Sequence, residues 1–174
     1  DAKAALGEGA IWDADRRVLY WVDILGCQVH VYDPASDQDR AIDVGQYVGT
    51  VVGRRSGGLM LALHHGFASL DLETGQVEVV ADPEQHLPGN RFNDGKCDPA
   101  GRFWAGTLAL DGEPEVASLY RLDADLSVHK MLDGVTCSNG IVWTQDSRTM
   151  YYIDTALRRV DAFDYDPESG AISR

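Results

Sequence analysis

The chain has 174 residues, 44% of them apolar, so it is long enough to bury the core of one domain. Its formal net charge is −13. This charge disfavours binding to nucleic-acid phosphates and to anionic membrane surfaces, whereas the carboxylates suit a cation or a neutral polar substrate. We therefore expect neither a nucleic-acid partner nor a membrane partner.

The cysteines, at positions 27, 97 and 137, lie far apart and form no C-x-x-C pair. This spacing argues against a zinc knuckle and against a redox motif. No apolar run is long enough to span a bilayer, and the first ten residues lack the apolar core of a signal peptide. We expect a soluble protein with the cytoplasm as its default location. Because the sequence begins with Asp and not with Met, a removed leader stays open.

Short apolar runs rich in Val, Ile, Tyr and Trp recur along the whole chain, as is typical of β-strands. In chain order they cover residues 18–22, 29–32, 59–63, 103–104, 150–153 and 160–165. Turn-forming residues separate them, at 33–34, 56–58, 73–75, 99–101, 166–167 and 169–170. No ten-residue stretch free of such residues keeps the 3.6-residue apolar period of a helix. The sequence therefore predicts an all-β fold without a boundary that would mark a second domain.

One composite pattern, an apolar or aromatic residue followed by an aspartate that opens a turn, occurs four times. The aspartates are Asp33, Asp71, Asp123 and Asp166, on average about 44 residues apart. This is the period of a four-stranded blade in a β-propeller. The sequence predicts one domain, residues 1–174, that holds about four such blades. A β-sandwich or barrel with regularly spaced hairpins is the alternative.

Three polar residues occupy similar positions in this repeat. Glu8 and Asn139 each lie 12 residues before an aromatic residue of the following strand, and Asn93 lies 11 residues before one. The first strand of each propeller blade lines the central channel, so residues at the start of these strands converge near the axis. Side-chain oxygens that meet there suit a hard cation such as Ca²⁺ or Mg²⁺.

Each of these residues also has a plainer interpretation. Asn139-Gly140 and Asp94-Gly95 are turn signals, and Glu8 alone would be read as a solvated loop acid. The second repeat offers only an apolar residue or a glycine at this position, so the set of ligands is incomplete.

Several longer motifs are similar to those of one known family. The segments "GEGAIW", "NRFNDGK", "DPAGRFWAGT", "SNGIVW", "YYIDT" and "VDAFDYD" resemble the senescence marker protein, regucalcin and gluconolactonase family along essentially the whole chain. The resemblance implies a six-bladed propeller that binds one divalent cation in its axial channel and hydrolyses sugar lactones. Ca²⁺ is the first expectation for the cation, with Zn²⁺, Mg²⁺ and Mn²⁺ as alternatives.

The resemblance also implies roles for individual residues. Glu8 and Asn139 correspond to metal ligands, and Arg91 and Asn93 correspond to residues that hold the substrate. Asp111 stands where the family has a substrate-contacting glutamate, with a side chain one methylene shorter.

The sequence is shorter than the resemblance requires. Six blades need roughly 240 to 270 residues, and the family's remaining metal ligand, an aspartate that also acts as general base, has no counterpart before Arg174. No catalytic residue is therefore assigned. We expect that further C-terminal blades or a second chain complete the ring. A closed four-bladed ring would have to use another aspartate, such as Asp154.

No G-x-S-x-G, H-E-x-x-H or Walker motif occurs, so nucleophile-elbow, zinc-protease and nucleotide chemistry lack support. We predict a divalent-metal-dependent hydrolase that opens sugar lactones with a metal-activated water. The alternative is a calcium-binding or interaction propeller without significant catalysis.

Overall fold

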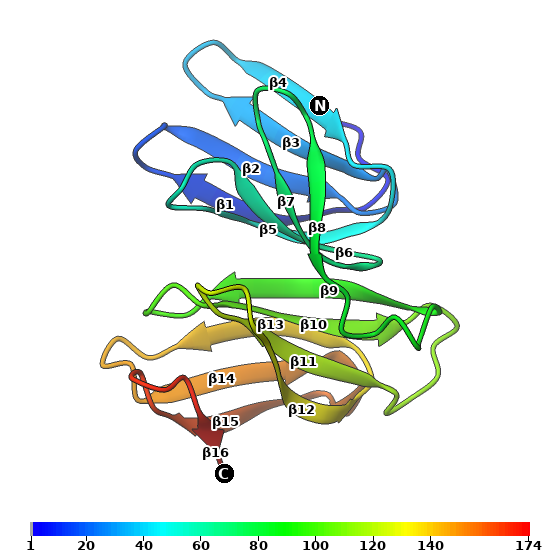
Figure 1. The fold of residues 1–174 in the computed structure, drawn as a ribbon, viewed down its shortest axis with the longest axis vertical. Coiled ribbons are helices and arrows are strands. Elements are labelled where there is room, and N and C mark those ends of the chain that lie inside the picture. Colours follow the sequence, from blue (N-terminus) through cyan, green and yellow to red (C-terminus); the bar gives the residue numbers. More distant parts are fainter. Residues whose placement is uncertain (1) are drawn as a thin grey trace. The chain divides into compact units, whose positions relative to one another are not determined.

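The computed structural model describes residues 2–174 and contains two compact units, which divide between Gln85 and His86. Each unit consists of two four-stranded antiparallel sheets, here called blades (Figure 1). Within every blade the strands are paired in chain order, from the first to the fourth. The all-β prediction is thereby confirmed.

The first unit holds blade 1 (β1, Gly7–Asp13; β2, Val18–Asp23; β3, Gln28–Asp33; β4, Gln38–Asp43) and blade 2 (β5, Val48–Gly53; β6, Leu59–Leu63; β7, Gly66–Leu70; β8, Val77–Ala81). The second unit holds blade 3 (β9, Asn90–Cys97; β10, Phe103–Ala109; β11, Ala117–Leu122; β12, Val128–Val135) and blade 4 (β13, Ser138–Trp143; β14, Thr149–Asp154; β15, Arg159–Tyr165; β16, Ile172–Ser173). A short 3₁₀ helix, η1 (Thr155–Leu157), follows β14. None of the helices within residues 2–174 has the length and apolar character to cross a membrane.

The apolar residues of the central strands build a separate core in each unit. In the first unit, alternate residues of β6, Leu59 and Leu61, pack with Tyr20 and Val22 of β2. This two-residue alternation puts one face of each sheet into the core. In the second unit, the corresponding cluster is formed by Trp104, Ala117, Leu119, Val135, Ile141, Met150, Tyr152, Phe163 and Tyr165. The two blades of each unit are therefore joined through buried sheet faces.

The repeated aspartates lie where the sequence pattern predicts them, at the end of the third strand of each blade. Asp33, Asp71 and Asp166 each accept a hydrogen bond from the backbone N–H two residues later. This is the geometry of an Asx turn, which fixes the connection to the fourth strand. Asp123 instead accepts two hydrogen bonds from the guanidinium of Arg121, at 2.7 and 2.9 Å.

The first strands of the blades carry β-bulges. In β9 the bulged residues are Asn93 and Asp94, and in β13 they are Asn139 and Gly140. In β1 the register shift follows Glu8. The interpretation of Asp94-Gly95 and Asn139-Gly140 as turns is wrong, because both dipeptides lie inside strands. Bulges redirect side chains locally, so the candidate polar residues lie at or beside backbone irregularities.

A buried aspartate connects the two blades of the second unit. One oxygen of Asp98 accepts hydrogen bonds from Nε of Arg102 (2.7 Å), Nε1 of Trp104 (3.0 Å) and the hydroxyl of Tyr165 (2.7 Å). Burial pushes the pKa of Asp98 upward, but these hydrogen bonds outweigh it and hold the pKa below its ordinary value of 3.8. Because Tyr165 belongs to β15, this carboxylate joins blade 3 to blade 4.

Candidate functional site

The start of the first strand in blade 4 is held by a buried aspartate at the end of the second strand. The carboxylate of Asp154 accepts hydrogen bonds from the backbone N–H groups of Thr136 (2.8 Å), Cys137 (3.0 Å) and Ala156 (3.2 Å). The N–H of Thr155 also donates to the carbonyl of Cys137, at 3.0 Å. Asp154 thus acts as a clamp on the backbone, and this makes it a poor substitute for a catalytic base.

Blade 1 repeats this arrangement. The carboxylate of Asp23 accepts hydrogen bonds from the backbone N–H groups of Ala5 and Leu6, both at 2.9 Å, and of Gly26, at 3.1 Å. The N–H of Ile24 donates to the carbonyl of Leu6, at 2.9 Å. Burial would raise the pKa of Asp23, but the three backbone hydrogen bonds outweigh burial and lower it. The same frame, in which a buried aspartate accepts three backbone N–H groups, therefore fixes the segments that precede β1 and β13.

The two clamps show that Glu8 and Asn139 have equivalent places in their blades. Each lies one residue after the strand partner of the clamp aspartate, and 15 residues before that aspartate. Glu8 is exposed and belongs to the first unit, whereas Asn139 is partly exposed and belongs to the second. Their role as metal ligands stays a prediction.

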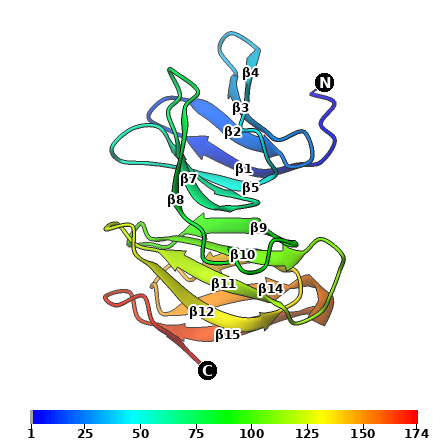
Figure 2. The same ribbon diagram turned by 45° about the vertical axis from the view of Figure 1, so that its right-hand side comes forward.

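Three of the predicted site residues lie on strands of the second unit, two on β9 (Figure 2) and one on β13. Nη1 of the buried Arg91 donates to Oδ1 of Asn93, at 3.0 Å. Nδ2 of Asn93 in turn donates to the carbonyl of Ser138, at 2.7 Å. Because Ser138 directly precedes Asn139, one chain of hydrogen bonds leads from Arg91 on β9 to the start of β13.

The amide of Asn139 is oriented by its own partner. Its Nδ2 donates to Oγ1 of Thr155, at 2.9 Å. With the nitrogen directed to Thr155, the amide oxygen Oδ1 lies on the other side of the group and presents lone pairs. An amide oxygen of this kind is a suitable ligand for Ca²⁺.

Asp94, the second bulged residue of β9, is a half-buried carboxyl beside the predicted substrate residue Asn93. Its Oδ1 accepts a hydrogen bond from the N–H of Gly95, at 2.8 Å. Burial nevertheless raises the pKa of Asp94 above its ordinary value. The raised pKa distinguishes this carboxyl from the aspartates of the surface turns, whose pKa values are lowered.

Asp111 lies apart from these residues in the chain, in the connection between β10 and β11. Its side chain is exposed, and Oδ1 accepts a hydrogen bond from the N–H of Glu113, at 3.1 Å. Asp111 therefore stabilises its own loop, and its predicted contact with substrate stays a prediction.

The donor set fits a hard cation held by oxygen ligands. Within residues 2–174 no three His, Cys, Asp or Glu side chains gather into a metal-binding group. The predicted ligands Glu8 and Asn139 supply a carboxylate and an amide oxygen, the donors that Ca²⁺ prefers. Zinc, which favours imidazole and thiolate, fits this donor set less well.

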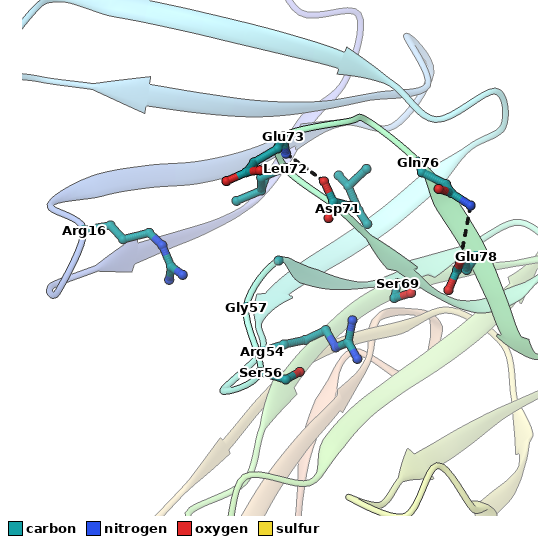
Figure 3. Close-up of a pocket in the computed structure, with 12 residues that line it drawn as sticks. Arg16, Arg54, Ser56, Gly57, Ser69, Asp71, Leu72, Glu73, Gln76 and Glu78 are labelled. Atoms are coloured by element: carbon teal, nitrogen blue, oxygen red, sulfur yellow. Dashed lines mark hydrogen bonds between the residues drawn. The ribbon is translucent and has the colours of Figure 1, made fainter.

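A cleft of about 680 Å³ lies elsewhere in the first unit (Figure 3). It is lined by residues of the β1–β2, β5–β6 and β7–β8 connections and of the adjoining ends of β7 and β8, and therefore lies at the other end of β1 from Glu8. Several of its polar side chains are engaged locally: Arg16 pairs with Asp13 at 3.0 Å, and Gln76 donates to Glu78 at 3.2 Å. None of the predicted site residues lines this cleft.

Comparison with known proteins places these features in a family context. A Bacillus subtilis (strain 168) protein whose name assigns it to the sugar lactone lactonases is 40% identical over 99% of this chain and 59% of its own length. Regucalcin of Gallus gallus is 43% identical over 96% of this chain and 58% of its own length. The chain thus spans about three-fifths of the length of these relatives.

A solved structure gives the same picture. The structure of regucalcin from Agrobacterium tumefaciens, described as a calcium-binding protein, superimposes with a TM-score of 0.92 at 27% identity, over 98% of this chain and 58% of the other. This similarity confirms the propeller prediction, with four of the family's blades present in residues 2–174. Residues 6–174 match the model of the SMP-30/Gluconolactonase/LRE-like region. The chain therefore belongs to the SMP-30/gluconolactonase/LRE-like family.

Proposed function

We propose that the protein hydrolyses sugar lactones and uses one divalent cation, Ca²⁺ in the first place, to do so. Family membership and the names of its relatives support the reaction class. The observation that carries the proposal for this chain is the repeated frame of Asp23 and Asp154, which gives Glu8 and Asn139 equivalent positions at the start of β1 and β13. A carboxylate oxygen and an amide oxygen at equivalent strand positions are two of the oxygen ligands of the kind that Ca²⁺ takes in proteins.

The residues of the chain have distinct tasks in this proposal. Glu8 and Asn139 hold the cation, which when bound polarises the lactone carbonyl and lowers the pKa of a bound water. Arg91 fixes the amide of Asn93 by donating to its oxygen. Asn93 then presents a defined amide to the hydroxyl groups of the sugar, which makes it a substrate-binding residue. Uncharged hydroxyl-rich substrates also agree with the net charge of −13, since no anion has to be attracted.

The test follows the hydrolysis of D-glucono-δ-lactone by pH-stat, with added Ca²⁺ and with excess chelator. We expect turnover that the chelator abolishes and that Ca²⁺ restores. The substitution Glu8→Gln should abolish cation binding without unfolding the protein, because Glu8 is exposed and packs into no core. Glu73→Gln, which neutralises another exposed acid of the first unit, is the matched control and should leave binding unchanged. Unchanged Ca²⁺ affinity in Glu8→Gln would show that Glu8 is a loop acid and no ligand.

The second candidate function is a calcium-binding or interaction propeller without significant catalysis. The description of the Agrobacterium tumefaciens relative as a calcium-binding protein favours it. Ca²⁺ binding by calorimetry without any metal-dependent turnover would select this function over the hydrolase.

A further inference from the structure

We propose that Thr155 is a positioning residue that holds the amide of Asn139 with its oxygen turned toward the cation. This inference rests on the proposed function, in which Asn139 is a metal ligand. A cation binds the oxygen of an amide, so the ligating orientation turns the NH₂ group back toward the protein. That NH₂ group needs an acceptor, and Oγ1 of Thr155 lies 2.9 Å from it.

The position of Thr155 is itself fixed by the backbone. Its N–H donates to the carbonyl of Cys137, at 3.0 Å, and it begins the 3₁₀ helix η1. Asp154 caps that helix by accepting from the N–H of Ala156, and it also holds Thr136 and Cys137. The segment before β13 and the segment after β14 are thus tied together, and the hydroxyl of Thr155 is carried on that frame to the side chain of Asn139.

Blade 1 supplies an internal comparison. The residue that follows its clamp aspartate is Ile24, whose N–H donates to the carbonyl of Leu6 just as the N–H of Thr155 donates to the carbonyl of Cys137. Ile24 is buried in the apolar core and has no hydrogen-bonding side chain. The ligand position of blade 1 carries Glu8, and a carboxylate has two equivalent oxygens and no N–H that needs an acceptor.

The two blades therefore combine residue types in a consistent way. Blade 1, which carries Glu8, has an apolar side chain directly after its clamp aspartate. Blade 4, which carries Asn139, has the hydroxyl group of Thr155 at that position. Asn93 shows the same requirement in another form, because its NH₂ group donates to the carbonyl of Ser138 while its oxygen accepts from Arg91. Both asparagines of this site thus have partners that distinguish the two ends of the amide.

The experiment measures the affinity of the protein for CaCl₂ by isothermal titration calorimetry in four variants. Thr155→Val and Thr155→Ala both remove the hydroxyl, and we expect each to weaken Ca²⁺ binding about three- to tenfold, the worth of one neutral hydrogen bond. Thr155→Ser keeps the hydroxyl and should bind as the unmodified protein does. Thr74→Val, which removes a threonine hydroxyl that bonds to Asp71 in the first unit, should leave the affinity unchanged.

Thermal melts in chelator separate positioning from folding. Because Thr155 is exposed, its substitutions should leave the melting temperature of the calcium-free protein nearly unchanged. Wild-type affinity in both Thr155→Val and Thr155→Ala would overturn the inference, and so would a Thr155→Ser variant as weak as these two. A protein that binds Ca²⁺ with this Thr155 dependence but hydrolyses no lactone would overturn the proposed hydrolase alone. Absence of Ca²⁺ binding in the unmodified protein would overturn both.

Discussion

The clamp formed by Asp154 provides the most direct test of how the site is built. In Asp154→Asn one of the two carboxylate oxygens becomes an NH₂ group of nearly the same size. The remaining oxygen can keep the N–H donors of Cys137 and Ala156, which share Oδ1, but the new NH₂ group would face the N–H of Thr136. Two donors then oppose each other in a buried place.

The magnitude follows from these three contacts. A buried backbone N–H left without an acceptor costs about 1–3 kcal/mol. Hydrogen bonds to an ionised acceptor are roughly twice as strong as neutral ones, so losing the charge weakens the two retained bonds by about 0.5–1 kcal/mol each. We expect Asp154→Asn to lower the free energy of unfolding by about 2–5 kcal/mol. Asp23→Asn should cost a similar amount, because its carboxylate also accepts three backbone N–H groups.

The assay is urea denaturation followed by circular dichroism and tryptophan fluorescence. Asp33→Asn serves as control, since Asp33 accepts its hydrogen bonds in an exposed turn and its substitution should cost much less than that of either clamp aspartate. A loss below about 0.5 kcal/mol in both Asp154→Asn and Asp23→Asn would refute the clamp as the element that orders the start of β1 and β13.

Three further predictions concern buried or half-buried groups. Because burial raises the pKa of Asp94, the folded protein favours the protonated carboxyl. The stability that the protonated form provides is complete below about pH 4, near the pKa of the unfolded chain, and is lost as the pH rises through the folded pKa. Asp94→Asn should therefore be more stable than the unmodified protein at pH 7 and equally stable near pH 3.5; equal stability in urea melts at both values would contradict this. Asp98→Ala leaves the guanidinium of Arg102 and two other buried donors without their acceptor. We expect the free energy of unfolding to fall by about 3–5 kcal/mol. A loss under about 1 kcal/mol in the same urea melts would argue against Asp98 as a link between blades 3 and 4. Burial raises the pKa of Cys97 to about 11, so iodoacetamide at pH 8 should label this thiol far more slowly in the folded protein than in urea. Peptide mass spectrometry measures the two rates, and equal rates would mean that the thiol is accessible in the folded protein.

The fold was predictable because its signals are local. An aspartate that opens the turn after the third strand depends only on the residues two or three positions later, as the hydrogen bonds of Asp33 and Asp71 show. Repetition of this local chemistry at a regular interval then indicates the blade. The division into two compact units left no comparable signal, since no linker or change in composition accompanies the step from Gln85 to His86.

The glycine dipeptides of the site show where local reasoning failed. Asn139-Gly140 has the composition of a hairpin turn, yet Gly140 lies in β13, where a Cβ would come within 3.2 Å of Cδ1 of Ile153. Gly95 lies in β9, where a Cβ would collide with the backbone carbonyl of Trp104. These glycines allow a neighbouring strand to approach closely, and that requirement depends on sheet pairing, which two letters of sequence do not encode.

Spacing predicts equivalent places for Glu8 and Asn139 in their blades, and the strand registers agree with this. Spacing does not predict the groups that fix the backbone and the amide at these places. Asp154 and Thr155 matter because of the backbone N–H groups and the amide they contact, and these partners lie 16 to 18 residues away in the sequence. Nothing in the segment "YYIDT" distinguishes a clamp carboxylate from a ligand carboxylate. Only the register between β13 and β14 makes the distinction.

The carboxylates of Asp23 and Asp154 accept hydrogen bonds from main-chain N–H groups, so the side chains of Glu8 and Asn139 are not part of these two frames. A carboxylate at position 8 and an amide at position 139 therefore stand on the same kind of backbone frame, and the residue after the clamp aspartate is Ile24 in the first case and Thr155, which accepts from the amide, in the second. In the proposed site, this separation between the backbone frame and the ligating side chains means that substitutions at positions 8 and 139 can alter the preference for one cation over another while the frame stays in place.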